Sequence, residues 1–280
     1  MIEMRAKDFK EINLPILKDK ISKLDIPLGL AVIQVGDNEA SDIYVKQKGK
    51  LAEELGYRFV HKKFDSNVNN NEVINYINEL NNDDSIDGII VQMPIPEHLD
   101  SVLIRNAVSP SKDVDGLTYG NAGMLLHNYP NLIPCTPKGI GELLDFYNID
   151  VDGMNAVVIG RSVLVGKPIA NVLTNRNATV TLCHSHSKDI PYYTKNADIV
   201  VVAVGKKDLL TEDMVKDGVI VVDVGINRVD GKLYGDVDFP NVSKKASYIT
   251  PVPGGVGPMT VYELMNNVYE AHRLRKNGLK

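Results

Sequence analysis

Residues 155–172, which read NAVVIGRSVLVGKPIANV, predict a strand, a tight turn and a helix. Ala156–Ile159 is a short apolar run of the kind that forms a buried strand, and Gly160 begins the turn. Pro168 suits the first turn of a helix because it has no backbone N–H to donate. A helix N-terminus that emerges from such a turn presents free N–H groups and a partial positive charge, so a phosphate can bind there.

The turn matches the dinucleotide-binding fingerprint only in part. That fingerprint is G-x-G-x-x-G. Here Ser162 stands at the second glycine, Val165 stands at the third, and Gly166 follows one place late. The turn by itself is therefore equally typical of an ordinary connection between a strand and a helix in any α/β protein.

The end of the next predicted strand, Ala178–Cys183, favours NADP over NAD. NAD enzymes commonly end that strand with an acidic residue that binds the ribose 2′-OH. Here the loop HSHS at 184–187 follows without a carboxylate, and Arg161 lies on the neighbouring turn. A guanidinium and a hydroxyl suit a 2′-phosphate, which a carboxylate would repel. We interpret His184 and His186 as loop residues and predict no metal site, because no cysteine or carboxylate lies at metal-ligand spacing.

Charge and hydropathy exclude several classes of protein. The formal charge of −5 over 280 residues argues against a nucleic-acid surface. We find no apolar run long enough to span a bilayer and no signal-peptide core at the N-terminus. We therefore expect a cytoplasmic protein that binds neither nucleic acid nor membrane. Cys135 and Cys183 are too few and too far apart for a disulfide framework, so we expect buried thiols.

Hydrophobic periodicity in the first half of the chain predicts alternating strands and helices. The expected strands are 28–35, 57–64 and 88–91, and the expected helices are 41–55, 70–80 and 98–107. Residues 4–24 have helical spacing, which we expect to break or kink near Pro15. Strands that alternate with helices in this way form a parallel sheet with right-handed crossovers.

The second half predicts another series of the same kind. Residues 109–136 interrupt the pattern with Pro, Gly, Asn and Asp, which indicates a linker near 110–137. The elements expected after it are a helix at 138–147, strands at 156–159, 178–183, 199–204, 219–224 and 248–250, a loop at 251–260 and a helix at 261–274. We therefore predict an α/β protein with mostly parallel sheets and two lobes: a three-layer lobe at 1–135, completed by the helix 261–280, and a Rossmann-like lobe at 136–260.

Four stretches carry side chains suited to chemistry. Tyr44 and Lys48 are one helical turn apart, which suits an acid–base pair but equally suits a surface pair on an amphipathic helix. Gln92 follows a predicted parallel strand, at the edge where such sheets bind ligands. The loop KDVDG at 112–116 holds two acids, one of which could simply cap a turn. The glycine-rich run at 253–258 allows close backbone approach to a ligand, or forms a hinge.

Together these stretches resemble one enzyme family. The matching segments are SDIYVKQK (41–48), DGIIVQMPIP (87–96), KDVDGL (112–117), PCTPKG (134–139), VIGRSVLVGKP (158–168) and TPVPGGVGPMT (250–260). In this order, and spread over nearly the whole chain, they are similar to the bifunctional methylenetetrahydrofolate dehydrogenase/methenyltetrahydrofolate cyclohydrolase family. The resemblance implies a folate-binding catalytic lobe at 1–135 and an NADP-binding lobe at 136–260.

The resemblance also implies a role for each candidate residue. Lys48 is expected to be the catalytic acid–base group, with Tyr44 packed on the folate, Gln92 hydrogen-bonded to Lys48, and Asp115 bound to the pterin ring. The implied substrate-binding residues are Tyr44, Lys48, Val91, Gln92, Met93, Asp115, Pro253, Gly254, Gly255, Val256 and Gly257. The implied cofactor-binding residues are Gly160, Arg161, Ser162, Ser185 and Ile226. Met93 stands where many relatives carry Leu.

The implied function is a two-step reaction on tetrahydrofolate derivatives. The family oxidises 5,10-methylenetetrahydrofolate to 5,10-methenyltetrahydrofolate with NADP+ and hydrolyses that product to 10-formyltetrahydrofolate. This is one-carbon metabolism, which serves purine, methionine and histidine biosynthesis, and the resemblance implies a homodimer formed through the nucleotide lobe. The alternatives are a shikimate-dehydrogenase-like NADP oxidoreductase and a non-catalytic NADP-binding sensor. A short-chain dehydrogenase is disfavoured because its nucleotide turn precedes Y-x-x-x-K.

We expect Arg161→Ala to weaken NADP binding far more than NAD binding. The reason is that the guanidinium would pair with the 2′-phosphate, which NAD lacks. Titration of the wild type and the variant with each dinucleotide checks this. A wild type that used NAD better than NADP at equal concentration would contradict the argument.

Overall fold

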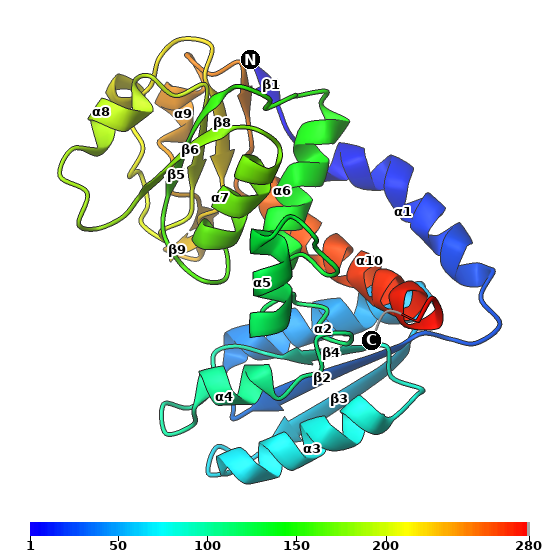
Figure 1. The fold of residues 1–280 in the computed structure, drawn as a ribbon. Helices are drawn as coiled ribbons and strands as arrows, with labels where there is room; N and C mark the ends of the chain where they lie inside the picture. The colour runs from blue at the N-terminus through cyan, green and yellow to red at the C-terminus, as the bar shows by residue number, and fades with distance from the viewer. Residues whose placement is uncertain (279–280) are drawn as a thin grey trace. The chain divides into compact units, whose positions relative to one another are not determined.

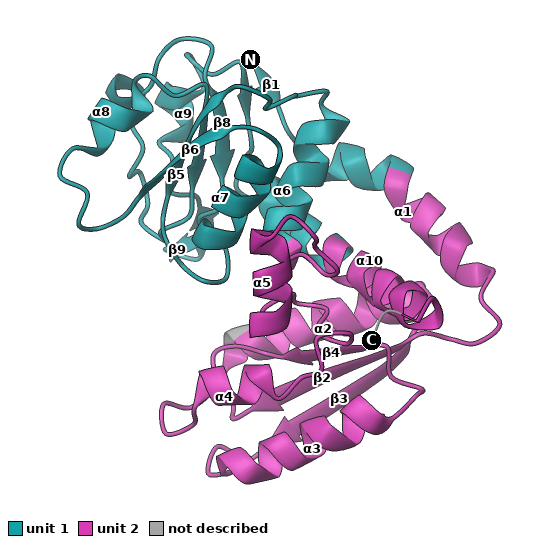
Figure 2. Cartoon of the chain, in the orientation of Figure 1, with its two compact units in different colours: residues 1–12, 136–262 teal, residues 13–135, 263–280 magenta. Residues whose placement is uncertain are grey.

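The computed structural model describes residues 1–278 and divides into two compact units (Figures 1 and 2). Unit 1 holds Met1–Ile12 and Thr136–Tyr262, and unit 2 holds Asn13–Cys135 and the chain from Glu263 onward. Each unit is built on its own parallel sheet. The predicted fold class, an α/β protein with mostly parallel sheets, is confirmed.

Unit 2 contains a three-stranded sheet with the strand order β3-β2-β4. These strands are β2 (Gly29–Val35), β3 (Arg58–Phe64) and β4 (Gly88–Val91). Every residue of β2 is buried, as expected for an apolar run covered on both faces. Figure 1 shows α2 (Glu39–Glu54) and α3 (Asn70–Asn82) on opposite faces of this sheet.

Short polar side chains begin the helices of unit 2. Asn38 accepts a hydrogen bond from Ser41 N at the start of α2, and Asn69 accepts one from Glu72 N at the start of α3. Asp100 does the same for α4 (Ser101–Asn106). These caps fix where each helix starts, because they satisfy N–H groups that have no partner within the helix.

Unit 1 contains a six-stranded parallel sheet with the order β1-β11-β8-β7-β5-β6. Its strands are β1 (Ile2–Glu3), β5 (Asn155–Ile159), β6 (Thr179–Cys183), β7 (Ile199–Val202), β8 (Ile220–Asp223) and β11 (Tyr248–Ile249). Its helices are α6 (Cys135–Phe146), α7 (Gly166–Asn175), α8 (Ile190–Thr194), α9 (Phe239–Val242) and the 3-10 turn Glu212–Met214. An antiparallel hairpin joins β9 (Asn227–Val229) and β10 (Lys232–Tyr234).

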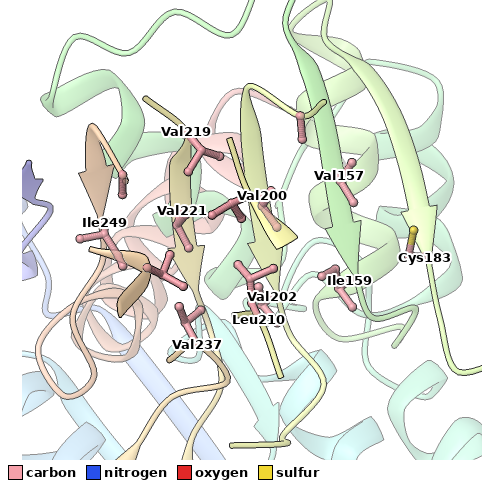
Figure 3. Close-up of a cluster of buried hydrophobic side chains, with 14 residues drawn as sticks. Val157, Ile159, Cys183, Val200, Val202, Leu210, Val219, Val221, Val237 and Ile249 are labelled. Carbon is pink, nitrogen blue, oxygen red and sulfur yellow. The ribbon is translucent and has the colours of Figure 1, made fainter. Parts of the chain in front are cut away.

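β-Branched residues of neighbouring strands form the core of unit 1 (Figure 3). Val157 and Ile159 of β5 lie beside Val200 and Val202 of β7, and Val221 of β8 continues the layer. All five side chains are at most 3% exposed. The buried layer holds the carboxyl ends of β5, β7 and β8 at one edge of the sheet, where the predicted nucleotide turn leaves β5.

Two expectations about proline were wrong. Helix α1 (Ala6–Ser22) continues through Pro15, because Phe9, Leu17 and Ile21 bury one face of it on both sides of the proline. Helix α10 (Val256–Lys276) begins five residues before the expected start, so the loop 251–260 is shorter than predicted. Pro258 falls in the first turn of α10, where its missing N–H would have no helical partner anyway.

Other differences concern segments with little periodicity. Helix α5 (Tyr119–Leu126) lies within the stretch expected to be irregular, and its start is capped by Thr118. The hairpin of β9 and β10 and the strand β1 are too short for periodicity to predict. Because β1 pairs in parallel with β11, residues 1–12 belong to unit 1 and not to the predicted lobe 1–135. Within residues 1–278, the structure contains no helix that is both long and apolar enough to cross a bilayer.

Two buried aspartates hold the loops at the carboxyl edge of the sheet in unit 1. Asp223, which is 2% exposed, accepts hydrogen bonds from the backbone N–H groups of Asp236 (2.9 Å) and Val237 (3.0 Å). Asp236 in turn accepts the N–H groups of the three consecutive residues 204–206 at 2.7 to 2.9 Å. Burial raises the pKa of Asp223 to about 6, against the opposing effect of these N–H donors.

The raised pKa predicts that Asp223 costs stability as the pH rises. Between its unfolded pKa of 3.8 and its native pKa of about 6, the native state binds more protons. The free energy of unfolding therefore falls as the pH rises through this window, by about 3 kcal/mol in all. Asp223→Asn removes this titration, so the free energy of unfolding of the variant relative to wild type should rise by most of that amount as the pH rises through this window.

Urea denaturation of both proteins at about pH 4.5 and about pH 7.5 measures the difference, since this interval brackets most of the titration. A difference between the two proteins that stays constant with pH would show that Asp223 does not titrate in this way.

Candidate active site

The side chains of Lys48 and Gln92 meet in unit 2. Lys48 lies on α2, and Gln92 follows the last residue of β4. Lys48 Nζ donates a hydrogen bond to Gln92 Oε1 at 2.9 Å, while Gln92 Nε2 donates to Met93 O at 2.7 Å. The second bond fixes the orientation of the amide, so its oxygen faces the lysine. Lys48 is only partly exposed and Gln92 is 9% exposed.

Tyr44 lies one turn before Lys48 on α2, and its ring is 41% exposed. The same helix is fixed to the strand that carries Gln92, because Ser41 Oγ donates to Met93 O at 3.4 Å. A Cβ atom at Gly49 would lie 2.9 Å from the ring of Phe59, so a glycine lets α2 approach β3. The structure thus brings the predicted pair of Lys48 and Gln92 together and leaves the phenol available to a ligand.

The two acids of the loop KDVDG have different hydrogen-bond partners. Asp113 is 4% exposed, and its Oδ2 accepts hydrogen bonds from Thr118 N (2.8 Å) and from Asn121 Nδ2 (2.9 Å) at the start of α5. Asp115 is partly exposed and has a long contact, 3.8 Å, with Cys135 Sγ. Asp113 therefore stabilises the loop, and Asp115 is the acid that can bind a ligand.

The groups around Asp115 shift the pKa of its carboxyl in opposite directions. Burial raises the pKa of its carboxyl, the positive charge of Lys48 lowers it, and the negative charge of Asp113 raises it again. The loop bends at Gly116, whose φ is 67° and whose Cβ would lie 2.6 Å from Pro134 N. Only glycine allows this close approach, so the sequence KDVDG fixes the place of Asp115.

Two residues near Asp115 were not predicted as site residues. Cys135 was expected to be a buried thiol, and it is buried and in no disulfide. Its Sγ contacts Val114 O at 3.2 Å as well as the carboxyl of Asp115. Asn267 of α10 donates to Val114 O at 2.9 Å. Their positions depend on pairing between distant segments, which sequence periodicity does not reveal.

The turn after β5 in unit 1 is built around two glycines. Gly160 has φ 121°, and a Cβ atom on it would lie 2.2 Å from Ala203 O. A Cβ atom on Gly166 would lie 1.9 Å from Gly160 O, so Gly166 lets α7 start close against the strand. Gly166 thus takes the packing role of the third glycine of the fingerprint, although it is one place late.

Ser162 lies inside this turn. Its Oγ accepts hydrogen bonds from Val165 N at 3.1 Å and Gly166 N at 3.3 Å. The hydroxyl therefore caps the start of α7. A phosphate at this helix end can replace Ser162 Oγ as the acceptor of these N–H groups, or it can accept a hydrogen bond from the Ser162 hydroxyl. Either contact suits the phosphates of a dinucleotide.

Arg161, on the turn after β5, places a positive charge near the end of β6. Partial burial lowers the pKa of His184, and the positive charges of Arg161 and His186 lower it further. Arg161 and Ser185 are exposed, and no acidic residue follows β6 until Asp189. This arrangement fits a phosphate on the ribose better than a free 2′-OH. Ile226, which is 50% exposed, follows β8 at the same edge of the sheet.

The glycine-rich loop is placed by backbone hydrogen bonds within unit 1. Ala6 N donates to Gly254 O at 2.9 Å, and Gly254 has φ 105°. A Cβ atom on Gly255 would lie 2.6 Å from Pro251 O, so this glycine is required by packing. Val256, which is 3% exposed, and Gly257 lie in the first turn of α10. Pro253–Gly257 belong to unit 1, whereas Lys48 and its neighbours belong to unit 2.

Sequence profiles of one family match most of the chain. The profile described as "Tetrahydrofolate dehydrogenase/cyclohydrolase, catalytic domain" matches residues 4–115. The profile described as "Tetrahydrofolate dehydrogenase/cyclohydrolase, NAD(P)-binding domain" matches residues 134–276. The chain belongs to this family. The predicted resemblance is confirmed, and with it the predicted enzyme class, a dehydrogenase and cyclohydrolase of tetrahydrofolate derivatives.

Individual relatives in the tetrahydrofolate dehydrogenase/cyclohydrolase family cover almost the full chain. The bifunctional protein FolD of Nitratiruptor sp. is 49% identical over 98% of this chain and 100% of its own length. That of Campylobacter jejuni is 52% identical over 89% of each chain. A crystal structure of the Campylobacter jejuni bifunctional enzyme FolD has a TM-score of 0.97 at 48% identity, covering 98% of this chain and 99% of that one.

The shikimate-dehydrogenase alternative is not favoured. A shikimate 5-dehydrogenase from Thermus thermophilus has a TM-score of 0.52 at 14% identity, covering 88% of this chain. At that identity the likeness shows a shared fold alone.

Among residues 1–278, no group of three histidine, cysteine or acidic side chains could hold a metal ion.

We expect Asp115→Ala and Asp113→Ala to have different effects. A carboxylate can accept two hydrogen bonds from one edge of a pterin ring, each contributing about 1.5–3 kcal/mol, so Asp115→Ala should lower folate affinity more than tenfold. Asp113→Ala leaves the buried N–H groups of Thr118 and Asn121 without this acceptor, so it should mainly lower stability.

Titration with tetrahydrofolate at fixed NADP, together with thermal unfolding of each variant, separates the two effects. Unchanged binding by Asp115→Ala, or a larger loss of binding in Asp113→Ala, would show that the two roles are assigned wrongly.

Proposed function

We propose that this chain oxidises 5,10-methylenetetrahydrofolate with NADP+ and hydrolyses the 5,10-methenyl product to 10-formyltetrahydrofolate. The observation that carries the proposal is the 2.9 Å hydrogen bond between Lys48 Nζ and Gln92 Oε1 in a chain of this family. The bond holds the amine of Lys48 in place on α2. The carboxylate of Asp115 interacts with this amine through its charge, and the exposed phenol of Tyr44 lies one helical turn away. In this proposal Lys48, Tyr44, Gln92 and Asp115 form the folate site, lined also by Val91 and Met93.

The dehydrogenase step needs positioning more than acid–base chemistry. Bound NADP+ would accept a hydride from the methylene carbon between N5 and N10. No proton moves in that step, so the residues of the chain chiefly orient the two rings. Asp115 would bind the pterin edge and Tyr44 would pack on the folate.

The cyclohydrolase step needs a proton acceptor. Water attacks the methenyl carbon, its O–H bond breaks, and the proton passes to the amine of Lys48. The second O–H bond then breaks as the formyl C=O forms, the bond from that carbon to N5 breaks, and N5 takes up one proton, so the step releases one proton in all. Gln92 Oε1 holds the amine in place by accepting one of its hydrogens.

The cofactor of this proposal is NADP, held by Gly160, Arg161, Ser162, Ser185 and Ile226 in unit 1. The positive charge of Arg161 near the end of β6 supports the 2′-phosphate form. A relative from Trypanosoma brucei, 33% identical with a TM-score of 0.92, was solved complexed with NADP cofactor and an inhibitor, and the two chains cover 98% of each other. We further propose that the folate site lies in unit 2, that the nucleotide site lies in unit 1, and that the chain acts as a cytoplasmic homodimer.

We expect Lys48→Met to lose cyclohydrolase activity by at least about a hundredfold, the usual scale for removing a general acid–base group. The variant should remain folded and should bind NADP as the wild type does, because Lys48 lies in unit 2 and the nucleotide turn in unit 1. The assay follows the hydrolysis of methenyltetrahydrofolate by its absorbance.

Lys50→Met is the matched control, since Lys50 is an exposed lysine on the same helix. It should hydrolyse the substrate at the wild-type rate. Retention of most hydrolysis in Lys48→Met would remove the acid–base role from Lys48. Binding of NADP without turnover of any folate by the wild type would indicate a non-catalytic sensor instead.

A further inference from the structure

Asn267 is a buried amide on α10, and its side chain holds two separate stretches of backbone. Its Nδ2 donates to Val114 O at 2.9 Å and to Ile133 O at 2.9 Å. The residue is 1% exposed, so these bonds form away from water. All three segments belong to unit 2, although Asn267 is 153 residues from Val114 and 134 residues from Ile133 in the chain.

The first of these carbonyls belongs to the peptide unit that leads into Asp115. Val114 O also accepts from Cys135 Sγ at 3.2 Å, and the same sulfur lies 3.8 Å from Asp115 Oδ1. Asn267 Nδ2 lies 3.7 Å from that sulfur. Asn267, Cys135 and the backbone of Val114 therefore form a small buried cluster directly behind the carboxylate.

The second carbonyl belongs to the segment packed against the bend of the loop. Gly116 leaves no room for a Cβ atom, which would lie 2.6 Å from Pro134 N and 2.8 Å from Ile133 C. By binding Ile133 O and Val114 O together, Asn267 fixes the spacing between this segment and the loop. Asp115 lies between the two points at which the loop is held.

Other anchors hold the start of the loop, and a backbone hydrogen bond from Gly116 N to Asp113 O at 3.0 Å closes a turn around the Val114–Asp115 peptide unit. Lys112 Nζ donates to Leu80 O (2.9 Å) and Asp83 O (2.7 Å), and Asp113 binds the start of α5. These contacts fix where the loop begins. Within this turn, Asn267 and Cys135 are the side chains that bind the carbonyl of Val114, and the direction of the Asp115 carboxylate depends on that peptide unit.

We propose that Asn267 is a positioning residue that aims the Asp115 carboxylate at the pterin ring. Two parallel hydrogen bonds to one ring edge need both carboxylate oxygens in the plane of that edge. Displacement of a bound group by about 1 Å can lower the rate of an enzyme on the order of a hundredfold. Asn267 does not touch the folate and acts through the backbone of Val114. This inference rests on the proposed role of Asp115 in binding folate.

Asn267→Ala, with Asn266→Ala as its control, is the first experiment. Asn266 is the neighbouring amide on α10, and its Nδ2 donates within the helix to Glu263 at 3.0 Å. Titration with tetrahydrofolate should show about a tenfold loss of affinity in Asn267→Ala and wild-type affinity in Asn266→Ala. Titration with NADP should give the wild-type value in both variants, which a general loss of structure would not.

Asn267→Ser tests the same point with less disturbance if Asn267→Ala does not fold. Its hydroxyl can donate to one of the two carbonyls, so folate affinity should lie between those of the alanine variant and the wild type. Wild-type folate affinity in both Asn267 variants would overturn the proposal.

A double-variant cycle decides whether Asn267 acts through Asp115. If it does, adding Asn267→Ala to Asp115→Ala should cause no further loss of folate affinity. If the two losses multiply, Asn267 acts independently and the proposal is wrong. If Asp115→Ala alone leaves folate affinity unchanged, the proposed function of Asp115 fails and this inference fails with it. If only the Asn267 variants lack an effect, the inference fails and the role of Asp115 stands.

Discussion

Parallel pairing of β2 with β4 is the constraint on which the folate-site geometry depends. Parallel neighbours end at the same edge of a sheet, so the helix that follows β2 and the residue that follows β4 meet there. Lys48 on α2 and Gln92 after β4 are 44 residues apart in sequence, yet their side chains are 2.9 Å apart. Every residue of β2 is buried, so the layers on both faces of the sheet hold this strand in place.

The same constraint organises unit 1, where close backbone contact replaces side-chain contact. Gly160 approaches the end of β7, and Gly166 lets α7 begin against the turn. Helix N–H groups and the guanidinium of Arg161 therefore lie at one edge of the sheet. A turn that departs from the usual fingerprint can thus keep its physical function, because backbone distance matters more than the letter at each position.

Much of this structure follows from sequence patterns alone, and the exceptions have physical causes. Apolar runs and helical spacing predict the parallel strands and long helices, since burial of one face drives both patterns. Strand β1 and the hairpin of β9 and β10 have two or three residues per strand, too few for a period to appear. The start of α10 was missed because Pro and Gly signal a loop in sequence but also suit a first helical turn.

The candidate site divides in the same way. The residue types at 44, 48, 92 and 115 predict acid–base and binding chemistry, because few side chains can do that work. Sequence does not reveal which groups already have partners. Asp113 and Asp115 are two residues apart in the sequence. Asp113 accepts two hydrogen bonds at the start of α5, whereas Asp115 interacts electrostatically with Lys48. Asn267 lies on a helix that comes 150 residues later, so its contact with Val114 becomes visible only when the chain is folded. Function therefore depends on a pattern of hydrogen bonds, and that pattern is a property of the tertiary structure.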